Sequence, residues 1–176
     1  MVLSYMRKAR KNYKGHRRDT MRELYWDYGA KGIYYITINC KFKFPYFGKC
    51  KNGIVCLNQI GQLAYNDWQN LPNHYPYLKL GEFIIMPDHM HGIIINLHPR
   101  KIEMYSTGRN MSEISPKKGS IPSIIRSFKG GITRKCGDLC WKFKWQSSYY
   151  DQIIRDQTHL KNVTKYIQNN PKNWKK

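Results

Sequence analysis

Hydrophobic residues along the chain follow two periods, and each period predicts a different kind of element. Residues 33–40 are dense in β-branched and aromatic side chains, between a glycine and a lysine, which predicts a central strand. Residues 79–86 and 88–97 form two further extended runs, joined at Met86-Pro87. Because proline cannot donate a hydrogen bond to a sheet, this junction predicts an edge, a bend or a bulge.

Apolar residues at helical spacing occur in three other segments. Residues 58–70 predict a helix that ends before Pro72, since proline cannot continue a helix. Residues 121–136 predict a second helix. A third is predicted from about 157 to 169, with Asp156 as its N-cap.

Segments without a regular period separate these elements. Residues 47–57 indicate a short hairpin or loop, and residues 141–154 are aromatic and partly extended. Residues 98–119 have lost periodicity and are rich in Pro, Gly, Ser and Lys, which predicts a mobile loop. Helices interleaved with adjacent extended pairs favour an α+β fold with an antiparallel sheet. We expect one domain over 30–176, after an arm over 1–29.

The charge of the chain predicts a polyanionic partner. Lysine and arginine number 31 against 11 acidic residues, a formal net charge of +20. A compact fold would repel itself at this charge, so a nucleic acid is the favoured partner; the alternative is a generic basic surface. The candidate DNA contacts are basic residues of the arm, of the second helix and of the segment before the third: Arg7, Lys8, Arg10, Lys11, Arg17, Arg18, Lys129, Arg134, Lys135 and Arg155.

Cysteine usage and the absence of targeting signals predict a cytoplasmic protein. The five cysteines are odd in number and show no Cys-x-x-Cys spacing, which argues against a disulfide framework and a zinc ribbon. The first residues become basic before any long apolar run develops, unlike a secretory signal. No stretch reaches the roughly 18 apolar residues of a membrane span, so no membrane partner is expected.

A pair of histidines is the first candidate for chemistry. In a strand, alternate side chains leave the same face, so His89 and His91 project together with Cα atoms about 6.6 Å apart. Two imidazoles so placed can share one cation, while Met90 points into the packing layer. A His-x-His pair also occurs in plain sheets, and that reading stays open.

The final predicted helix supplies a second pair. Its apolar stripe includes Val163 and Ile167, and Tyr166 and Asn170 lie together at the shoulder of that stripe because they are four residues apart. A divalent ion held by two histidines and an amide oxygen keeps positions open for phosphate oxygens, and a tyrosine can then attack the phosphorus. Mixed nitrogen and oxygen ligands fit Mn²⁺ well and Mg²⁺ acceptably.

Two motifs resemble a known family. The segment MPDHMHGIII (86–95) is similar to the His-hydrophobic-His segment of the single-tyrosine HUH transposases. The segment WQSSYYDQIIRDQTHLKNVTKYIQNNPKNW (145–174) resembles the carboxyl-terminal signature of their REP-associated tyrosine transposase branch. With matches at Gly32 to Thr37 and Ser127 to Lys129, the likeness covers most of residues 30–174.

The resemblance implies a ferredoxin-like palm, with helices packed mainly on one face of the sheet. It assigns His89, His91 and Asn170 to the metal shell and Tyr166 to the nucleophile. Members of this family cut and rejoin single-stranded DNA beside hairpins through a 5′-phosphotyrosine, with Mg²⁺ or Mn²⁺. Where the family often has a histidine, this chain has Gln152, which puts any catalytic role of that position in doubt.

Several alternatives remain open at this point. Tyr149 and Tyr150 are rival nucleophiles, although neither has a candidate metal ligand four residues on. The aromatic residues of 141–150 fit base stacking or core packing. The chain could also be a non-catalytic hairpin-binding protein on the same fold, or a metal phosphoesterase that uses water. It could act as a monomer or a homodimer.

Overall fold

The computed structural model describes residues 26–98, 116–137, 139–140 and 142–174. The predicted arm lies outside them as far as residue 25, and the predicted loop from 99 to 115. The elements, in chain order, are β1 (Gly32–Asn39), the 3-10 turn η1 (Lys41–Lys43), β2 (Gly48–Lys51), β3 (Ile54–Leu57), α2 (Gln59–Gln69), α3 (Leu71–His74), β4 (Leu78–Ile85), β5 (His89–Asn96), α5 (Ile121–Cys136), β6 (Tyr150–Ile154) and α6 (Gln157–Asn169).

The main sheet has four strands in the order β4-β5-β1-β6, and every neighbouring pair is antiparallel. The β2–β3 hairpin lies outside this sheet. In chain order the main elements therefore run strand, helix, strand, strand, helix, strand, with the first strand between the third and the fourth. This is the ferredoxin-like arrangement, and the predicted α+β class with an antiparallel sheet is confirmed.

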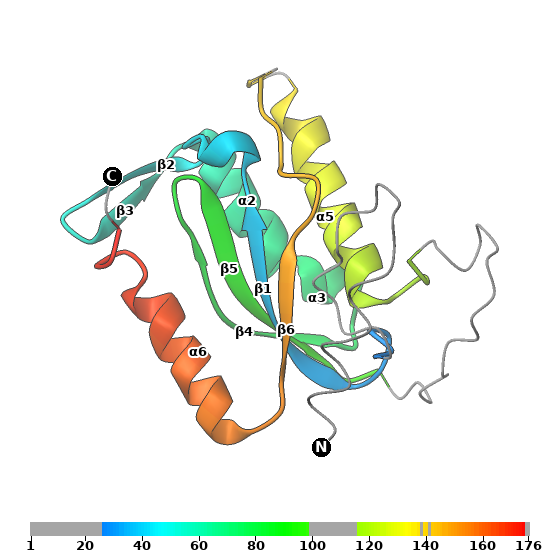
Figure 1. Ribbon diagram of the computed structural model, residues 1–176. Helices are drawn as coiled ribbons and strands as arrows, with labels where there is room; N and C mark the ends of the chain where they lie inside the picture. The colour runs from blue at the N-terminus through cyan, green and yellow to red at the C-terminus, as the bar shows by residue number, and fades with distance from the viewer. Residues whose placement is uncertain (1–25, 99–115, 138, 141, 175–176) are drawn as a thin grey trace, which may run out of the picture.

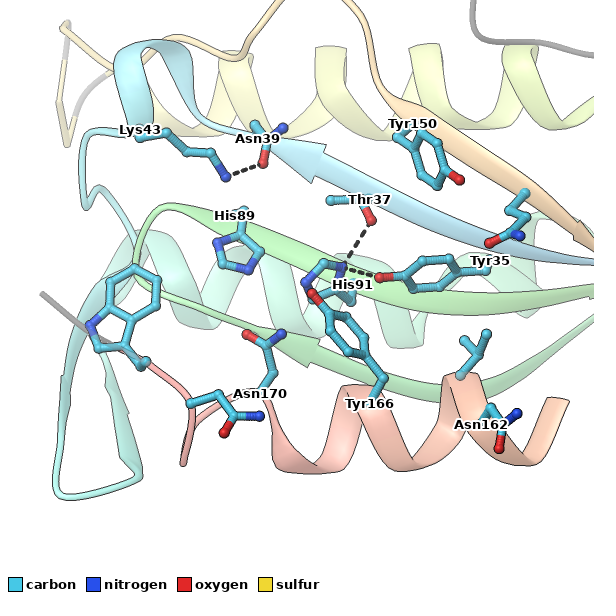
Figure 2. Close-up of a pocket in the computed structure, with 14 residues that line it drawn as sticks. Tyr35, Thr37, Asn39, Lys43, His89, His91, Tyr150, Asn162, Tyr166 and Asn170 are labelled. Carbon is cyan, nitrogen blue, oxygen red and sulfur yellow. Dashed lines mark hydrogen bonds between the residues drawn. The ribbon is translucent and has the colours of Figure 1, made fainter. Parts of the chain in front are cut away.

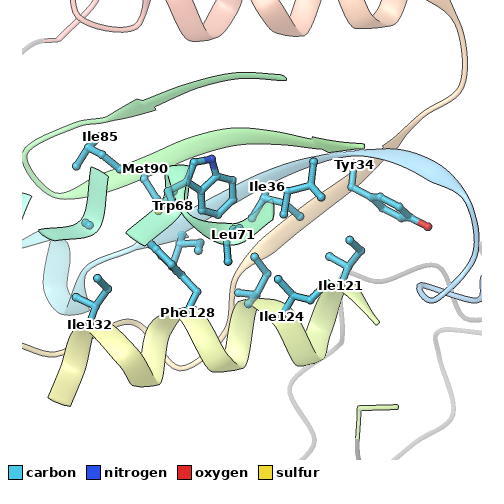
Figure 3. Packing of buried hydrophobic residues seen from close by; sticks show 14 of the residues in the cluster. Tyr34, Ile36, Trp68, Leu71, Ile85, Met90, Ile121, Ile124, Phe128 and Ile132 are labelled. Carbon is cyan, nitrogen blue, oxygen red and sulfur yellow. The ribbon is translucent and has the colours of Figure 1, made fainter. Parts of the chain in front are cut away.

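Helices cover both faces of the sheet unequally (Figure 1). On one face α2 and α5 enclose the larger hydrophobic core, in which Trp68, Phe128 and Met90 are buried against β1 and β5 (Figure 3). On the opposite face α6 packs through Val163 and Ile167 over a much smaller apolar cluster. Most helices thus lie on one face, as expected, and α6 is separated from them by the sheet.

Polar side chains define where several elements begin. The Asn58 side chain accepts a hydrogen bond from the backbone N–H of Gly61 at 3.0 Å, and Asp156 accepts one from His159 at 2.7 Å. Both satisfy N–H groups that a first helical turn leaves unpaired. The expectation that Pro72 only stops a helix was incomplete. Helix α2 ends at its cap Asn70, and Pro72 lies in the first turn of α3, where its missing N–H costs nothing.

Two properties of the side chains and helices bear on the sequence predictions. All five cysteines are free thiols, which agrees with the absence of a disulfide framework. Among the described residues no helix is both long and apolar enough to span a membrane.

Alternate side chains of β5 point to opposite faces of the sheet, one towards the larger core and the other towards α6. Met90 and Ile94 are fully buried in the larger core, whereas His89 and His91 leave the strand on the α6 face. Gly92, on the core side, lies directly against the indole of Trp68: a Cβ built there would be 2.4 Å from Cζ2 of that ring. A glycine at this position lets a large aromatic residue pack against the strand beside the histidines.

We expect Gly92→Ala to lower the free energy of unfolding by about 2–3 kcal/mol, because the added methyl overpacks a filled core. Urea denaturation followed by circular dichroism measures the change. Gly130→Ala is the matched control, since a Cβ there would have its nearest neighbour at 3.8 Å and alanine favours a helix interior. Equal effects of the two substitutions would contradict the packing described here.

Candidate active site

A pocket of about 760 Å³ opens between α6 and the α6-facing side of the sheet. It is lined by side chains from β1, β5, β6 and α6 and from the residues that follow α6 (Figure 2). The register of the sheet brings these side chains together, because Thr37 pairs with His91 and Asn39 with His89 across β1 and β5. Alternate residues of two paired strands therefore face one cavity.

The two histidines lie side by side in this pocket, as their spacing predicts. Their ring centroids are 4.7 Å apart and their planes are inclined at 74°. Both side chains come from strand β5, whose backbone is hydrogen-bonded on both sides. His89 is 8% exposed and His91 4%, so the pair sits at the bottom of the pocket in fixed positions.

His91 is held by one ring nitrogen and leaves the other unused. Its Nδ1 lies 2.8 Å from the hydroxyl of Tyr35 and 2.9 Å from that of Thr37. Its Nε2 is buried and has no hydrogen-bond partner among the described residues. When Nδ1 carries the proton and donates it to a hydroxyl, Nε2 presents a lone pair to the pocket, which is the arrangement of a metal-binding histidine.

The ring of His89 is contacted by the carboxylate of Asp88 and the amide of Asn170. The Asp88 carboxylate, itself buried, lies 2.5 Å from Nδ1 of His89 and accepts a hydrogen bond from it. The Asn170 side chain lies within hydrogen-bond reach of the same ring. The indole of Trp174 stacks on the ring at a centroid distance of 5.8 Å. A carboxylate that binds Nδ1–H directs the Nε2 lone pair away from itself and raises its basicity.

Tyr166 projects from α6 over the histidines. Its ring meets that of His91 edge to face at 5.3 Å, and that of Tyr35 at 6.3 Å. Tyr166 is nevertheless 52% exposed, so a large substrate can reach the residue. Of the rivals, Tyr150 lines the same pocket from β6, whereas Tyr149 packs against the larger core on the opposite face.

The donor set fits a divalent cation of the harder kind. The buried and unpartnered Nε2 of His91, the neighbouring ring of His89 and the amide of Asn170 surround one corner of the pocket. In the described part of the chain, no group of three His, Cys, Asp or Glu side chains could hold a metal. A cation at this corner would meet two imidazole nitrogens and an amide oxygen, a mixed donor set that suits Mg²⁺ or Mn²⁺ better than zinc.

Burial favours the neutral form of both imidazoles. Removal from water lowers the pKa of His89, although the Asp88 carboxylate opposes this shift. For His91 burial is also the main cause, followed by repulsion from His89 and Lys43, and the pKa falls to about 3. A neutral imidazole is the form that binds a metal, so no proton has to leave His91 at neutral pH.

The lowered pKa of His91 predicts acid sensitivity of the metal-free protein. Between pH 6.5 and pH 3 the unfolded chain binds a proton at this residue that the folded chain does not, so stability is lost as the pH falls. At pH 5 the loss from this residue is about 2 kcal/mol. Urea denaturation in EDTA at pH 7 and pH 5 should show a smaller loss for His91→Gln. The exposed His74→Gln serves as control; a pH response in His91→Gln equal to that of the wild type would contradict the assignment.

Several pocket residues were not foreseen from the sequence. Tyr35, Thr37 and Asn39 alternate along β1 and face the histidines, but only the strand register reveals this. Lys43 reaches the pocket from η1 and donates a hydrogen bond to Asn39 at 2.6 Å. Gln152, the position that departs from the family pattern, also lines the pocket, opposite Tyr35 in the sheet.

The predicted DNA contacts lie apart from this pocket or outside the described residues. Lys129 donates to the carbonyl of Gln146 at 2.6 Å, and burial lowers its pKa to about 8. Lys135 pairs with Asp67 at 2.5 Å. Arg134 lies beside them on α5, and Arg155 lines a separate cavity next to β6. The six arm residues fall within 1–25, so all ten contacts stay predictions.

Comparison with known proteins gives a relative in sequence and a likeness in structure. No family model matches the chain. An uncharacterized protein of Haemophilus influenzae is 37% identical over 165 residues, which cover 90% of this chain and 91% of that protein. A REP-associated tyrosine transposase, solved bound to a REP hairpin, matches with a TM-score of 0.59 at 17% identity, over 88% of this chain and 73% of the other.

A putative transposase from Deinococcus radiodurans matches more weakly, with a TM-score of 0.47 and 15% identity over 84% of this chain and 95% of the other. The likeness to the REP-associated tyrosine transposase, at 17% identity, establishes the fold alone, and the 37% match to the Haemophilus influenzae protein establishes the family. The chain therefore belongs to the family of the uncharacterized Haemophilus influenzae protein and has the fold of a REP-associated tyrosine transposase.

Proposed function

We propose that this protein is a metal-dependent, single-tyrosine DNA endonuclease and strand transferase, a transposase of the HUH type, which acts on single-stranded DNA near hairpins. The observation that carries the proposal is the buried Nε2 of His91, which has no partner among the described residues, in a ring that meets the ring of Tyr166 edge to face at 5.3 Å. A nitrogen left without a partner in a pocket is costly unless a ligand uses it. The fold shared with a transposase bound to a REP hairpin supports DNA as the substrate.

The residues of the pocket divide the work of strand cleavage. His89, His91 and Asn170 would hold a Mg²⁺ or Mn²⁺ ion, which withdraws charge from a phosphate and so favours attack on its phosphorus. Tyr166 supplies the attacking oxygen from a side chain that remains open to solvent. The bond from phosphorus to the 3′ oxygen breaks as the phenol oxygen bonds to phosphorus, and the phenol proton ends on the released 3′-hydroxyl.

The product is a 5′-phosphotyrosine, which keeps the energy of the broken bond. An aryl ester is a good leaving group. Attack by a 3′-hydroxyl of the same or another strand therefore reseals DNA and returns the proton to Tyr166. No cofactor that carries chemical energy is needed, and cutting and joining are one reaction run in two directions.

The direct test is to trap the covalent intermediate. The full-length protein is incubated with Mn²⁺ and hairpin oligonucleotides that carry a labelled single-stranded flank, and adducts that survive denaturing electrophoresis are digested and mapped by mass spectrometry. We expect a nucleotide on the peptide that contains Tyr166, and none in EDTA. Cleavage without an adduct would indicate water as the nucleophile, and binding without cleavage a recognition module; either result would refute the proposal.

The hydrogen bonds of Tyr35 and Thr37 to Nδ1 of His91 give a prediction about metal affinity. Tyr35→Phe removes one of the two hydroxyls at Nδ1, so the orientation of the ring is less well fixed. We expect about a tenfold rise in the Mn²⁺ concentration that gives half-maximal adduct formation, with recovery at saturating metal. The neighbouring Tyr34→Phe is the control, because the Tyr34 hydroxyl donates to the carbonyl of Ala30 on the core face. An unchanged metal requirement in Tyr35→Phe would contradict the role.

A further inference from the structure

The turn η1 separates the candidate active site from a second pocket. Lys43 lines the pocket of the histidines, while Lys41 and Phe42 line another of about 690 Å³ on the other side of the turn. The turn is fixed in place, since the backbone N–H of Lys41 donates to the carbonyl of Lys144 at 2.8 Å and Cys40 pairs with Trp145 as an isolated bridge. Three consecutive residues thus form a common wall of two cavities.

The backbone of Phe42, in the turn η1 between the two pockets, is strained. Its φ of 57° and ψ of 20° are in the left-handed region, which a bulky side chain enters only against steric resistance. The ring gains no burial in return, because it is 90% exposed. Backbone strain that exposes an apolar ring has no benefit for folding, and strain of this kind is concentrated at functional sites.

The second pocket combines an aromatic floor with a basic rim. Phe143 and Trp145 form part of its lining, and the Phe143 side chain is itself buried in the larger core. Lys41 and Lys144 are exposed at the rim, and the amino group of Lys41 lies 5.0 Å from the centre of the Phe42 ring. None of the described residues that line this pocket is acidic.

These features select a ligand with a flat apolar face and a negative charge close to it. An unpaired nucleotide has both, and a base in a duplex does not offer its face for stacking. Lysines beside an exposed ring are the combination by which proteins follow a single strand. Phe143 and Trp145, which the sequence offered for base stacking or core packing, form the floor of the second pocket. The exposed ring of Phe42 is available for stacking on a base.

We infer that this second pocket is a subsite for an unpaired nucleotide of the DNA strand that passes the active site, with its base stacked on Phe42 and its phosphates near Lys41 and Lys144. The inference rests on the proposed function, because it extends the path of the strand whose phosphate lies at His89 and His91. It names single-stranded DNA, and not the hairpin stem, as the ligand of this surface.

The test measures binding separately from cleavage. Fluorescence anisotropy in EDTA gives the affinity of the full-length protein for a hairpin oligonucleotide with a labelled single-stranded flank. We expect Phe42→Ala to raise the dissociation constant about tenfold. Phe44→Ala is the matched control: this ring is also exposed, at 56%, but it packs against Tyr46 and does not line the pocket. It should change the constant less than twofold.

A second variant distinguishes loss of the Phe42 ring from loss of the folded structure. Phe42→Gly removes the ring and relieves the left-handed strain, so it should weaken binding like Phe42→Ala while the melting temperature stays equal to or above that of the wild type. The double variant Lys41→Ala/Lys144→Ala should lower the slope of log affinity against log salt by about 1.4, as expected for two phosphate contacts on a single strand.

The outcomes separate this inference from the proposed function. If the wild type forms no adduct but Phe42→Ala still weakens binding, the subsite stands and the cleavage proposal fails. If the wild type forms the adduct and both Phe42 variants bind like Phe44→Ala, the subsite is refuted while the cleavage proposal stands. A loss of affinity that is equal for the hairpin with and without its flank would also refute the subsite.

Discussion

Replacement of Tyr166 by phenylalanine is expected to abolish the covalent DNA adduct and to reduce strand cleavage by about 10³-fold or more. The substitution removes one oxygen and keeps the ring, which contacts His91 and Tyr35 edge to face. Folding and hairpin binding should therefore be unchanged. Denaturing electrophoresis of the protein with a labelled hairpin oligonucleotide measures both the adduct and the cut strand.

The matched control for this experiment is Tyr150→Phe. Tyr150 lines the same pocket from β6 and contacts Tyr35 at 6.4 Å, so it tests whether any hydroxyl in the cavity suffices. We expect adduct formation within about threefold of the wild type. An adduct that persists in Tyr166→Phe, or one that is lost in Tyr150→Phe, would move the nucleophile to another residue.

The second large effect is expected for His91→Ala. This change removes the buried Nε2 that has no partner among the described residues and with it one of the two proposed imidazole ligands. We expect Mn²⁺ binding, measured by calorimetry or by the paramagnetic resonance of free Mn²⁺, to become undetectable at millimolar metal. Cleavage should fall by about 10³-fold, since an ion on phosphate contributes several kcal/mol to such reactions.

Hairpin affinity in EDTA distinguishes this loss from unfolding. It should be the same for His91→Ala and the wild type, and the control His74→Ala, an exposed residue of α3, should keep both metal binding and cleavage. A metal titration that does not change in His91→Ala would remove the histidine pair from the site. His89→Ala should behave like His91→Ala, because the two rings are neighbours in one cavity.

Local patterns in the sequence were sufficient for the elements that carry these residues. The bounds of α5 and α6 follow from apolar spacing and from Asp156 as a cap, and alternation along β5 directed Met90 to the core and the histidines to the other face. Tyr166 and Asn170 line the same pocket as the histidines. Short-range periodicity determines which face of an element a residue occupies, and this is information within a single segment.

Several features of the pockets could not be predicted from the sequence, because they depend on contacts between segments that are distant in the chain. Tyr35 and Thr37 reach His91 only because β1 pairs with β5 in one register, and a shift of one residue would turn them to the core. The exposure of Phe42 depends on a left-handed turn in a non-glycine residue, which no residue type signals. Lys129 could not be distinguished from a surface charge until its carbonyl partners were known.

The unequal cores on the two faces have a consequence for movement. Helix α6 buries Val163 and Ile167 on a small cluster, whereas the larger core lies beyond the sheet and includes neither residue. Detachment of α6 therefore requires only part of the free energy of global unfolding, and the remaining layers keep their packing when it occurs. If Tyr166 carries a DNA end, that end is attached to a helix outside the larger core, and it can leave the histidines while the strand that remains bound stays where it is.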